Sequence, residues 1–192
     1  MKKNTEASHY DILAVRAANG DQIAFAELYE YSFPRVYNFI FAKVKDAELA
    51  DDIVSDVFIK VYQKLGMYDR EKAAFSTWLF RMALNTMTDN LRKQDRKRED
   101  TWEDFFDPAG PVSEQPESVA LKKEQNDTLL KAIDKLNERG RRIVELKFWS
   151  GLSNTEIAEI MDLSVSNVGT ILTRAMIKLR KILGDNAPDL GE

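Results

Sequence analysis

Two helix starts of the same design follow each other in the C-terminal part of the sequence. Ser153 precedes Glu156 by three residues, which is the spacing of a capping box at the start of a helix. Further along, Ser164 stands before a second apolar segment and predicts another helix start. The turn between them, about residues 162–164, allows only a sharp corner. The sequence therefore predicts a helix-turn-helix here.

The second helix of this corner, expected from Ser164 to Leu183, is basic and has no acidic residue, although the whole chain has a net charge of −4. A basic helix on an acidic protein indicates a phosphate partner, and the second helix of such a corner enters the major groove of DNA. Helical corners with serine caps also occur in proteins that bind no DNA. Lysines near a helix C-terminus, moreover, favour the helix dipole.

Apolar residues along this helix are spaced by three and four and predict one buried stripe. The stripe consists of Val165, Val168, Leu172, Ala175, Leu179 and Ile182. Polar and basic residues at or beyond the helix start remain available for base edges or phosphates. These candidate contact residues are Ser164, Ser166, Asn167, Thr170, Thr173, Arg174 and Lys178.

Composition narrows the classes of function. The chain has 192 residues, of which 44% are hydrophobic, enough for one ordinary domain or two small ones. It has no cysteine and a single histidine, His9, which argues against thiolate or histidine catalysis and against a cysteine-based metal site. No apolar stretch approaches the ~20 residues of a membrane span, and the start lacks a secretory segment. We expect a cytoplasmic protein without membrane insertion, metal or cofactor.

Residues 99–120 hold three of the five prolines and seven acidic residues, with no lysine or arginine. This composition predicts an acidic linker, with a short helical turn around residues 102–106. The expected domains are then 1–98 and 121–185, followed by a tail, 186–192. A linker of some 25 residues spans on the order of 80 Å when extended, so the two domains can contact separate DNA sites.

All segments outside the linker are predicted to be helical, and no useful run has the period of two that marks a strand. Pro34 is expected to kink or restart its helix, and Ser76 is expected to cap the long one. The predicted fold is all-α, with a helix that begins at Gln22 and meets Pro34, further helices at about residues 10–18, 46–65, 77–98, 121–137 and 140–148, and the two helices of the corner.

Three segments in this order resemble the bacterial sigma factors of the extracytoplasmic-function (ECF) type, a branch of the sigma-70 family. The first covers residues 46–62, and the second runs from Phe75 through Asn85 to Arg92. The third is the helix-turn-helix with the preceding residues 136–142. The resemblance covers nearly the whole chain. It implies promoter DNA and core RNA polymerase as partners, with an anti-sigma factor as a further partner.

The first segment is similar to the family helix that docks on the clamp coiled coil of RNA polymerase. It has five acidic and no basic residues from Asp46 to Asp56, and apolar residues spaced by four predict a buried edge. By composition alone, a solvated acidic helix face is the alternative. The polymerase-binding residues that the resemblance implies are Asp51, Asp52, Asp56, Val57 and Phe58.

The second segment is similar to the family helix that opens the −10 element of the promoter. Opening needs a surface that replaces base stacking, and the aromatic residues Tyr68, Phe75 and Trp78 are candidates, although an aromatic at a helix start is more often in the core. Five positive residues within 92–98 suit the phosphates of a separated strand. The resulting −10 candidates are Tyr68, Trp78, Asn85, Asp89, Arg92 and Arg96.

The third segment, similar to the family domain that reads the −35 element, departs from the usual family pattern in its recognition helix. Ser166 and Asn167 stand where relatives commonly have Gly-Thr, and Gly169, Thr170 and Ile171 follow where relatives carry two further basic residues. The first two turns are therefore uncharged, which argues against the usual promoter sequence. Asn167 is expected to be the best single base reader, since its amide can pair with adenine.

Two alternatives remain open. The acidic residues Glu27, Glu30, Glu48 and Asp51 match the spacing of helical nucleoside-triphosphate pyrophosphatases, in which four carboxylates hold magnesium. That enzyme would leave the helix-turn-helix unexplained. An ordinary helix-turn-helix regulator without polymerase contact would have no need of the segment from Phe75 to Trp78 beside a basic helix.

Overall fold

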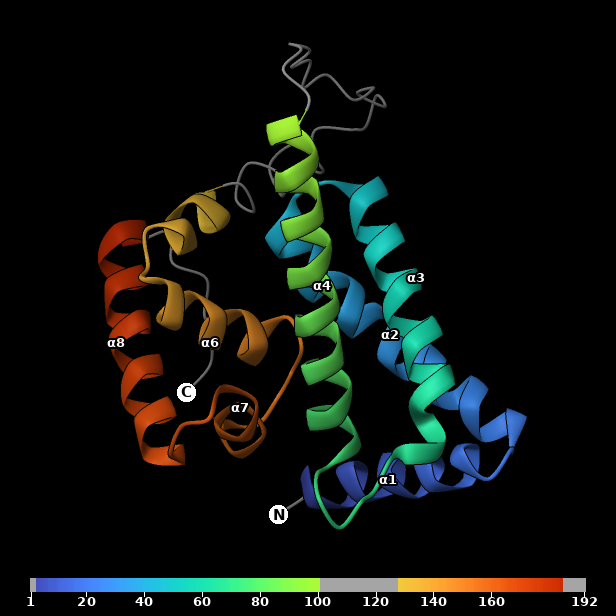
Figure 1. The fold of residues 1–192 in the computed structure, drawn as a ribbon. Helices are drawn as coiled ribbons and strands as arrows, with labels where there is room; N and C mark the ends of the chain where they lie inside the picture. The colour runs from blue at the N-terminus through green and yellow to red at the C-terminus, as the bar shows by residue number, and fades with distance from the viewer. Residues whose placement is uncertain (1–2, 101–127, 185–192) are drawn as a thin grey trace, which may run out of the picture.

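The structure, a computed structural model, describes residues 3–100 and 128–184. Within these two ranges every regular element is a helix and no strand occurs, which confirms the all-α prediction (Figure 1). The helices form an N-terminal module and a C-terminal module. The predicted linker beyond Asp100, the predicted helix over 121–127 and the tail 186–192 lie outside the described residues.

The N-terminal module has four α-helices and a short 3-10 helix. Their bounds are α1 Lys3–Ala18, α2 Gln22–Val44, α3 Ala47–Lys64, η1 Leu65–Met67 and α4 Phe75–Asp100. The carboxylates of Asp21 and Asp46 accept the free N–H groups at the starts of α2 and α3, each at 3.0 Å. Both predicted helix starts are thus confirmed.

Of the two outcomes expected at Pro34, the restart is wrong. Helix α2 continues through Pro34, because Ser32 and Val36 on either side of it are buried and tertiary packing outweighs the ~3 kcal/mol that an interior proline costs. The predicted cap of α4 is wrong as well. Ser76 does not cap α4. The helix begins at Phe75, whose N–H donates to the carboxylate of Asp11 on α1 at 2.7 Å. A residue distant in sequence has taken over the capping.

The C-terminal module has a helix over residues 128–134, then α6 Glu138–Phe148, α7 Asn154–Met161 and α8 Val165–Leu183. Ser153 and Glu156 form the complete capping box of α7, with N···O distances of 3.2 and 2.7 Å. Ser164 caps α8 by accepting from the N–H of Asn167. The helix-turn-helix is therefore present where the sequence predicts it.

The two modules share one hydrophobic core. Phe39 and Phe80 of the N-terminal module and Leu146 and Ile157 of the C-terminal module belong to the same buried cluster, and none of them is more than 1% exposed. Helix α7 lies against the N-terminal half of α4 (Figure 1). A second, smaller cluster joins α6 and α8 to the helix over 128–134. The structure is thus a closed arrangement of the two modules.

Polar contacts accompany this shared core. The guanidinium of Arg35 on α2 donates to the carbonyl of Ser150, with its Nε at 2.8 Å. On α4, Arg81 donates to the carbonyl of Glu159 at 2.6 Å, and the Ser76 hydroxyl donates to the Glu156 carboxylate. Glu156 therefore contributes both to the capping box of α7 and to the contact between the modules.

Candidate functional site

The outer face of α3 presents the acidic side chains that were predicted to dock the polymerase. Asp51, Asp52 and Asp56 are all exposed. Val57 and Phe58, predicted for the same contact, are only 0% and 8% exposed and lie in the core. The prediction that these two make direct contacts is thereby corrected. They belong to the inward edge of an amphipathic helix, where they hold α3 in the module.

A row of aromatic side chains along α2 lies beside this acidic face and was not predicted from the sequence. Its members are four residues apart, so that each lies next to the following one and the row winds slowly around the helix: Phe25, Tyr29, Phe33, Tyr37 and Phe41. Ring contacts link the row to α3 through Phe25 with Tyr62 and Tyr29 with Phe58.

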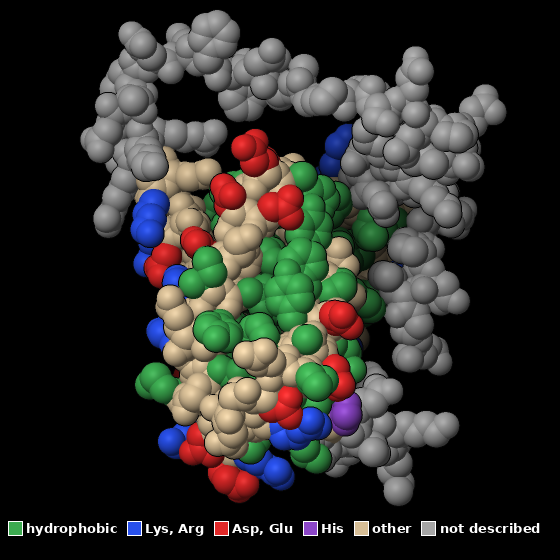
Figure 2. Space-filling view, turned by 90° about the vertical axis from the view of Figure 1, so that its right-hand side faces the viewer, with side chains coloured by type: hydrophobic (Ala, Val, Ile, Leu, Met, Phe, Trp, Pro, Cys, Tyr) green, Lys and Arg blue, Asp and Glu red, His purple; other side chains and the backbone are tan. Residues whose placement is uncertain are grey.

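Tyr62 is 70% exposed, so apolar surface continues onto α3. Figure 2 shows a hydrophobic band on this side of the molecule, with acidic side chains around one end. The α3 face therefore offers a partner both charge and apolar area. The constant spacing of four along α2 was the signal in the sequence that reveals it.

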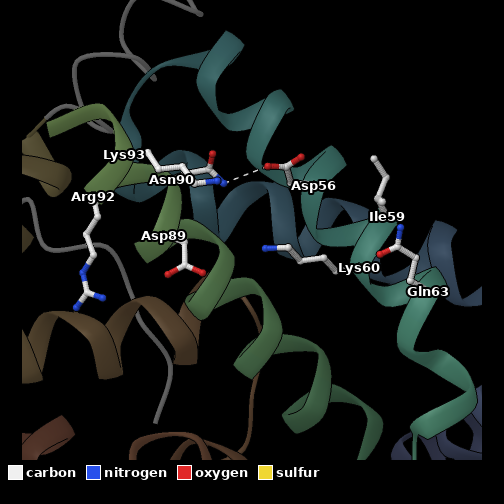
Figure 3. Close-up of a pocket in the computed structure, with 8 residues that line it drawn as sticks. All are labelled: Asp56, Ile59, Lys60, Gln63, Asp89, Asn90, Arg92 and Lys93. Atoms are coloured by element: carbon white, nitrogen blue, oxygen red, sulfur yellow. Dashed lines mark hydrogen bonds between the residues drawn. The ribbon is translucent and has the colours of Figure 1, made fainter. Parts of the chain in front are cut away.

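A groove between α3 and α4 brings two predicted surfaces together. It encloses about 520 Å³ and is lined by Asp56, Ile59, Lys60 and Gln63 from α3 and by Asp89, Asn90, Arg92 and Lys93 from α4 (Figure 3). The Asn90 amide donates to the Asp56 carboxylate at 3.2 Å, and the Lys60 ammonium donates to the Thr86 hydroxyl at 3.1 Å. A predicted docking residue and two predicted −10 residues thus face one groove.

Tyr68 was predicted to contact bases, but its side chain is buried in the N-terminal module. It is 8% exposed, and its hydroxyl donates to Asp11 at 3.1 Å. Burial, followed by the charge of Asp11, raises the pKa of Tyr68 well above its usual value. Its ring packs with Phe75 and Trp78 at centroid distances of 5.8 and 5.6 Å. Sequence spacing gave no sign that Asp11, far away in the chain, would fix this tyrosine.

The other −10 candidates lie on α4. Trp78 is half-buried and packs against the core, as the core alternative expected, yet part of it remains accessible. Asn85, Asp89 and Arg92 are exposed and follow one another at spacings that keep them on one side of the helix. The side chain of Arg96 lies outside the described residues. Helix α4 therefore presents a polar face with an aromatic residue at its start.

Helix α8 exposes every residue that was predicted to contact the −35 element: Ser164, Ser166, Asn167, Thr170, Thr173, Arg174 and Lys178. The Lys178 ammonium donates to the carbonyl of Lys135 at 2.6 Å, which ties it to the turn after the helix over 128–134. Val168, Ala175 and Leu179 of the predicted stripe are buried. Val165 is 47% exposed and does not belong to it. As the first helical residue, Val165 stands on the flank of the helix rather than over the core.

The carboxylates of the enzyme alternative do not come together. In the described residues, no group of three or more acidic or histidine side chains is placed to hold a metal ion. Glu27, Glu30, Glu48 and Asp51 are all described and exposed, and thus do not form the four-carboxylate cluster that a pyrophosphatase requires. No helix within residues 3–100 and 128–184 is both long and apolar enough to cross a membrane.

Comparison with known proteins gives two family matches. Residues 28–97 match the model of sigma-70 region 2, and residues 126–179 match that of sigma-70 region 4. The ECF RNA polymerase sigma factor RpoE of Cereibacter sphaeroides is 33% identical over 84% of this chain and 87% of its own length. SigW of Bacillus subtilis is 30% identical over 86% of this chain and 92% of its own length.

BldN of Streptomyces coelicolor, another ECF RNA polymerase sigma factor, is 30% identical over 91% of this chain, which spans 66% of BldN. Among solved structures, CnrH in complex with the cytosolic domain of CnrY has a TM-score of 0.63 and 26% identity, over 93% of this chain and 99% of CnrH. The chain belongs to the sigma-70 family, as a sigma factor of the ECF type.

Proposed function

We propose that this ECF sigma factor directs core RNA polymerase to promoters through three separate surfaces: α3 docks on the polymerase, α4 opens the −10 element and α8 reads the −35 element. It does so in the cytoplasm and without covalent chemistry of its own. The observation that carries the proposal is the character of three helix faces in chain order: α3 exposes acidic side chains, α4 exposes polar side chains beside the half-buried Trp78, and α8 exposes polar and basic side chains. This order agrees with that of the two matched regions.

The docking step rests on the outer face of α3. Asp51, Asp52 and Asp56 give this face a concentrated negative charge, and the neighbouring aromatic row supplies apolar area. A basic coiled coil with some apolar residues is complementary to such a face, and charge complementarity speeds association. Since Asp56 also accepts from Asn90, docking takes place beside the groove that leads to α4.

The opening step rests on α4. A separated strand needs a partner for its unstacked bases and cations for its phosphates. Trp78 supplies the accessible aromatic surface, while Arg92 and Lys93 supply positive charge at the α3–α4 groove. Tyr68 has a supporting part in this proposal, because its buried ring packs against Trp78.

The closed arrangement has a consequence for promoter recognition. Glu159, which touches Arg81 of α4, is fifteen residues before Arg174 on α8. A helical residue advances the chain by ~1.5 Å and any other residue by at most ~3.5 Å, so the Cα atoms of Glu159 and Arg174 lie within ~35 Å of each other. Elements centred about 25 base pairs apart on straight duplex are separated by ~85 Å. We therefore infer that the modules separate when both elements are bound.

An anti-sigma factor is included among the partners. RpoE of Bartonella quintana, which shares the fold with a TM-score of 0.64 at 21% identity, over 85% of this chain and 98% of that one, was solved in complex with the anti-sigma factor NepR. A partner that holds the two modules in the closed arrangement would prevent the separation described above.

Charge reversal on α3 tests the docking step. We expect the double variant Asp52→Lys and Asp56→Lys to lose association with core polymerase by at least about tenfold, while thermal stability changes by less than ~0.5 kcal/mol because all replaced side chains are exposed. Co-purification with core polymerase and thermal unfolding are the measurements. Glu71→Lys, an exposed reversal in the loop before α4, is the matched control. Full core binding by the folded double variant would contradict the proposed docking face.

A further inference from the structure

The outward row of α8 consists largely of methyl-bearing side chains. Ser166, Thr170, Thr173 and Ile177 follow at spacings of four, three and four and therefore lie on one side of the helix. All four are exposed, and Ile177 is 60% exposed. This side is opposite to the buried Val168, Ala175 and Leu179. It is the side that a recognition helix turns towards the floor of the major groove.

The two threonines in this row use their hydroxyl protons within the helix. Thr170 Oγ1 donates to the carbonyl of Ser166 at 3.0 Å, and Thr173 Oγ1 donates to the carbonyl of Gly169 at 2.9 Å. With the donor proton engaged, what these side chains offer a neighbouring base is chiefly their methyl groups. A row of methyl groups without charge recognises an apolar feature of the groove.

No contact within residues 3–100 and 128–184 explains Gly169, which lies between these residues in a regular helix. Apart from its chain neighbours and the nearby backbone of α8, a Cβ atom added there would have no described atom within 4 Å. Glycine costs about 1 kcal/mol relative to alanine in a helix. The free space lies beside the outward row, where a duplex would approach. The missing side chain allows the α8 backbone to come closer to the DNA than an alanine would.

In the major groove, thymine is the base that carries an apolar group, its 5-methyl, and threonine methyl groups contact it. We propose that Thr170, Thr173 and Ile177 recognise the 5-methyl groups of thymines in the −35 element, with Gly169 permitting the close approach. This inference rests on the proposed function of α8. It adds the base class that the middle of the helix selects, beside the adenine expected for Asn167.

Replacement of thymine by deoxyuridine removes only the 5-methyl group and tests the proposal directly. The −35 sequence is first selected from a randomised upstream element by the holoenzyme, and each thymine is then replaced singly. We expect the wild-type holoenzyme to bind about fourfold more weakly at one or more positions, the amount that burial of one methyl group contributes.

The variants Thr170→Ser and Thr173→Ser remove the protein methyl and keep the hydroxyl. Each is expected to lose the distinction between thymine and deoxyuridine at one position and to retain it elsewhere. Ile23→Ala is the control, since Ile23 is exposed on α2, far from the −35 surface. Thermal unfolding of each variant shows that folding is unchanged.

Different failures have different meanings. If the holoenzyme depends on the −35 sequence but binds deoxyuridine as well as thymine at every position, the proposal is overturned and the function of α8 stands. A selected element without thymine overturns it equally. If the holoenzyme shows no dependence on the upstream sequence at all, the proposed function of α8 fails, and this inference fails with it.

Discussion

The α3–α4 surface and the recognition helix are built on different principles. On α3 and α4, side chains near the groove depend on partners from other helices, as in the pairs of Asn90 with Asp56 and Lys60 with Thr86. On α8, the outward hydroxyls of Thr170 and Thr173 donate to carbonyls of their own helix. The first surface is therefore sensitive to how the module is assembled, whereas the outward row of α8 from Ser166 to Ile177 is a property of one helix.

The largest expected effect comes from breaking the tertiary support of the first surface. Asp11→Ala removes the acceptor of the Phe75 N–H that starts α4 and one of the two acceptors of the Tyr68 hydroxyl, which keeps the Ala73 carbonyl at 3.3 Å. Leaving the buried Phe75 N–H unpaired costs about 1–3 kcal/mol, so we expect a loss of roughly 2 kcal/mol in urea unfolding. Promoter opening should weaken as well.

Asp11→Asn retains an acceptor oxygen and serves as the matched control, with most of the stability kept. If Asp11→Ala unfolds at the same urea concentration as the wild type, then the start of α4 does not depend on α1. The contrast between the two surfaces would then disappear.

A smaller effect is expected at the exposed end of the same surface. Arg92→Ala should slow promoter opening on duplex about tenfold, because a cation beside the separated strand is lost, but have little effect on a template with a pre-melted bubble. Arg16→Ala, on α1, is the control. Equal losses on both templates would assign Arg92 to polymerase binding or folding.

On the recognition helix, a single substitution should alter reading and leave stability unchanged. Asn167→Ala is expected to relax the preference at one base position by about 1–3 kcal/mol, since the exposed amide can pair with adenine. Lys181, an exposed basic residue in the last turn of α8, is suited to a phosphate contact, so Lys181→Ala should weaken all sequences alike and reduce the salt slope by about one unit. A promoter selection that returns the wild-type sequence with the Asn167→Ala protein would remove Asn167 as a reader.

The smallest expected effect concerns a buried acid in α6. Glu145 is 5% exposed, and burial raises its pKa despite nearby cations. The folded protein thus favours the protonated form of Glu145. The contribution of Glu145 to stability is present at low pH and is lost as pH rises through the raised pKa. Glu145→Gln should raise Tm at pH 7 by on the order of 2 °C, and the difference should shrink towards acid pH. A pH series of thermal unfolding measures it.

The contrast also explains what could be read from the sequence. Ser153, Glu156 and Ser164 predicted the helix-turn-helix because caps and periodicity are local signals. The exposed side chains of α8 could be predicted from its single apolar stripe, apart from Val165 at the helix start. Family resemblance placed the α3 and α4 segments but did not show which side chains face outward.

The failures of sequence prediction involve distant partners. Tyr68 was expected to contact bases, but its hydroxyl donates to Asp11 on α1. Ser76 was expected to cap α4, but Asp11 accepts from the first N–H of α4 and the Ser76 hydroxyl donates to Glu156. Packing of the two modules into one core could not be read from periodicity either, because an amphipathic helix shows that a face is buried but not against which helix.

Transcription from a genomic fragment library, by core polymerase with and without this chain, tests the central claim most directly. We expect a set of start sites that appear only with the chain and share two upstream elements at a fixed spacing. Such sites should vanish with the double variant Asp52→Lys and Asp56→Lys. Start sites identical to those of core polymerase alone, from a chain that is folded and binds the polymerase, would contradict it.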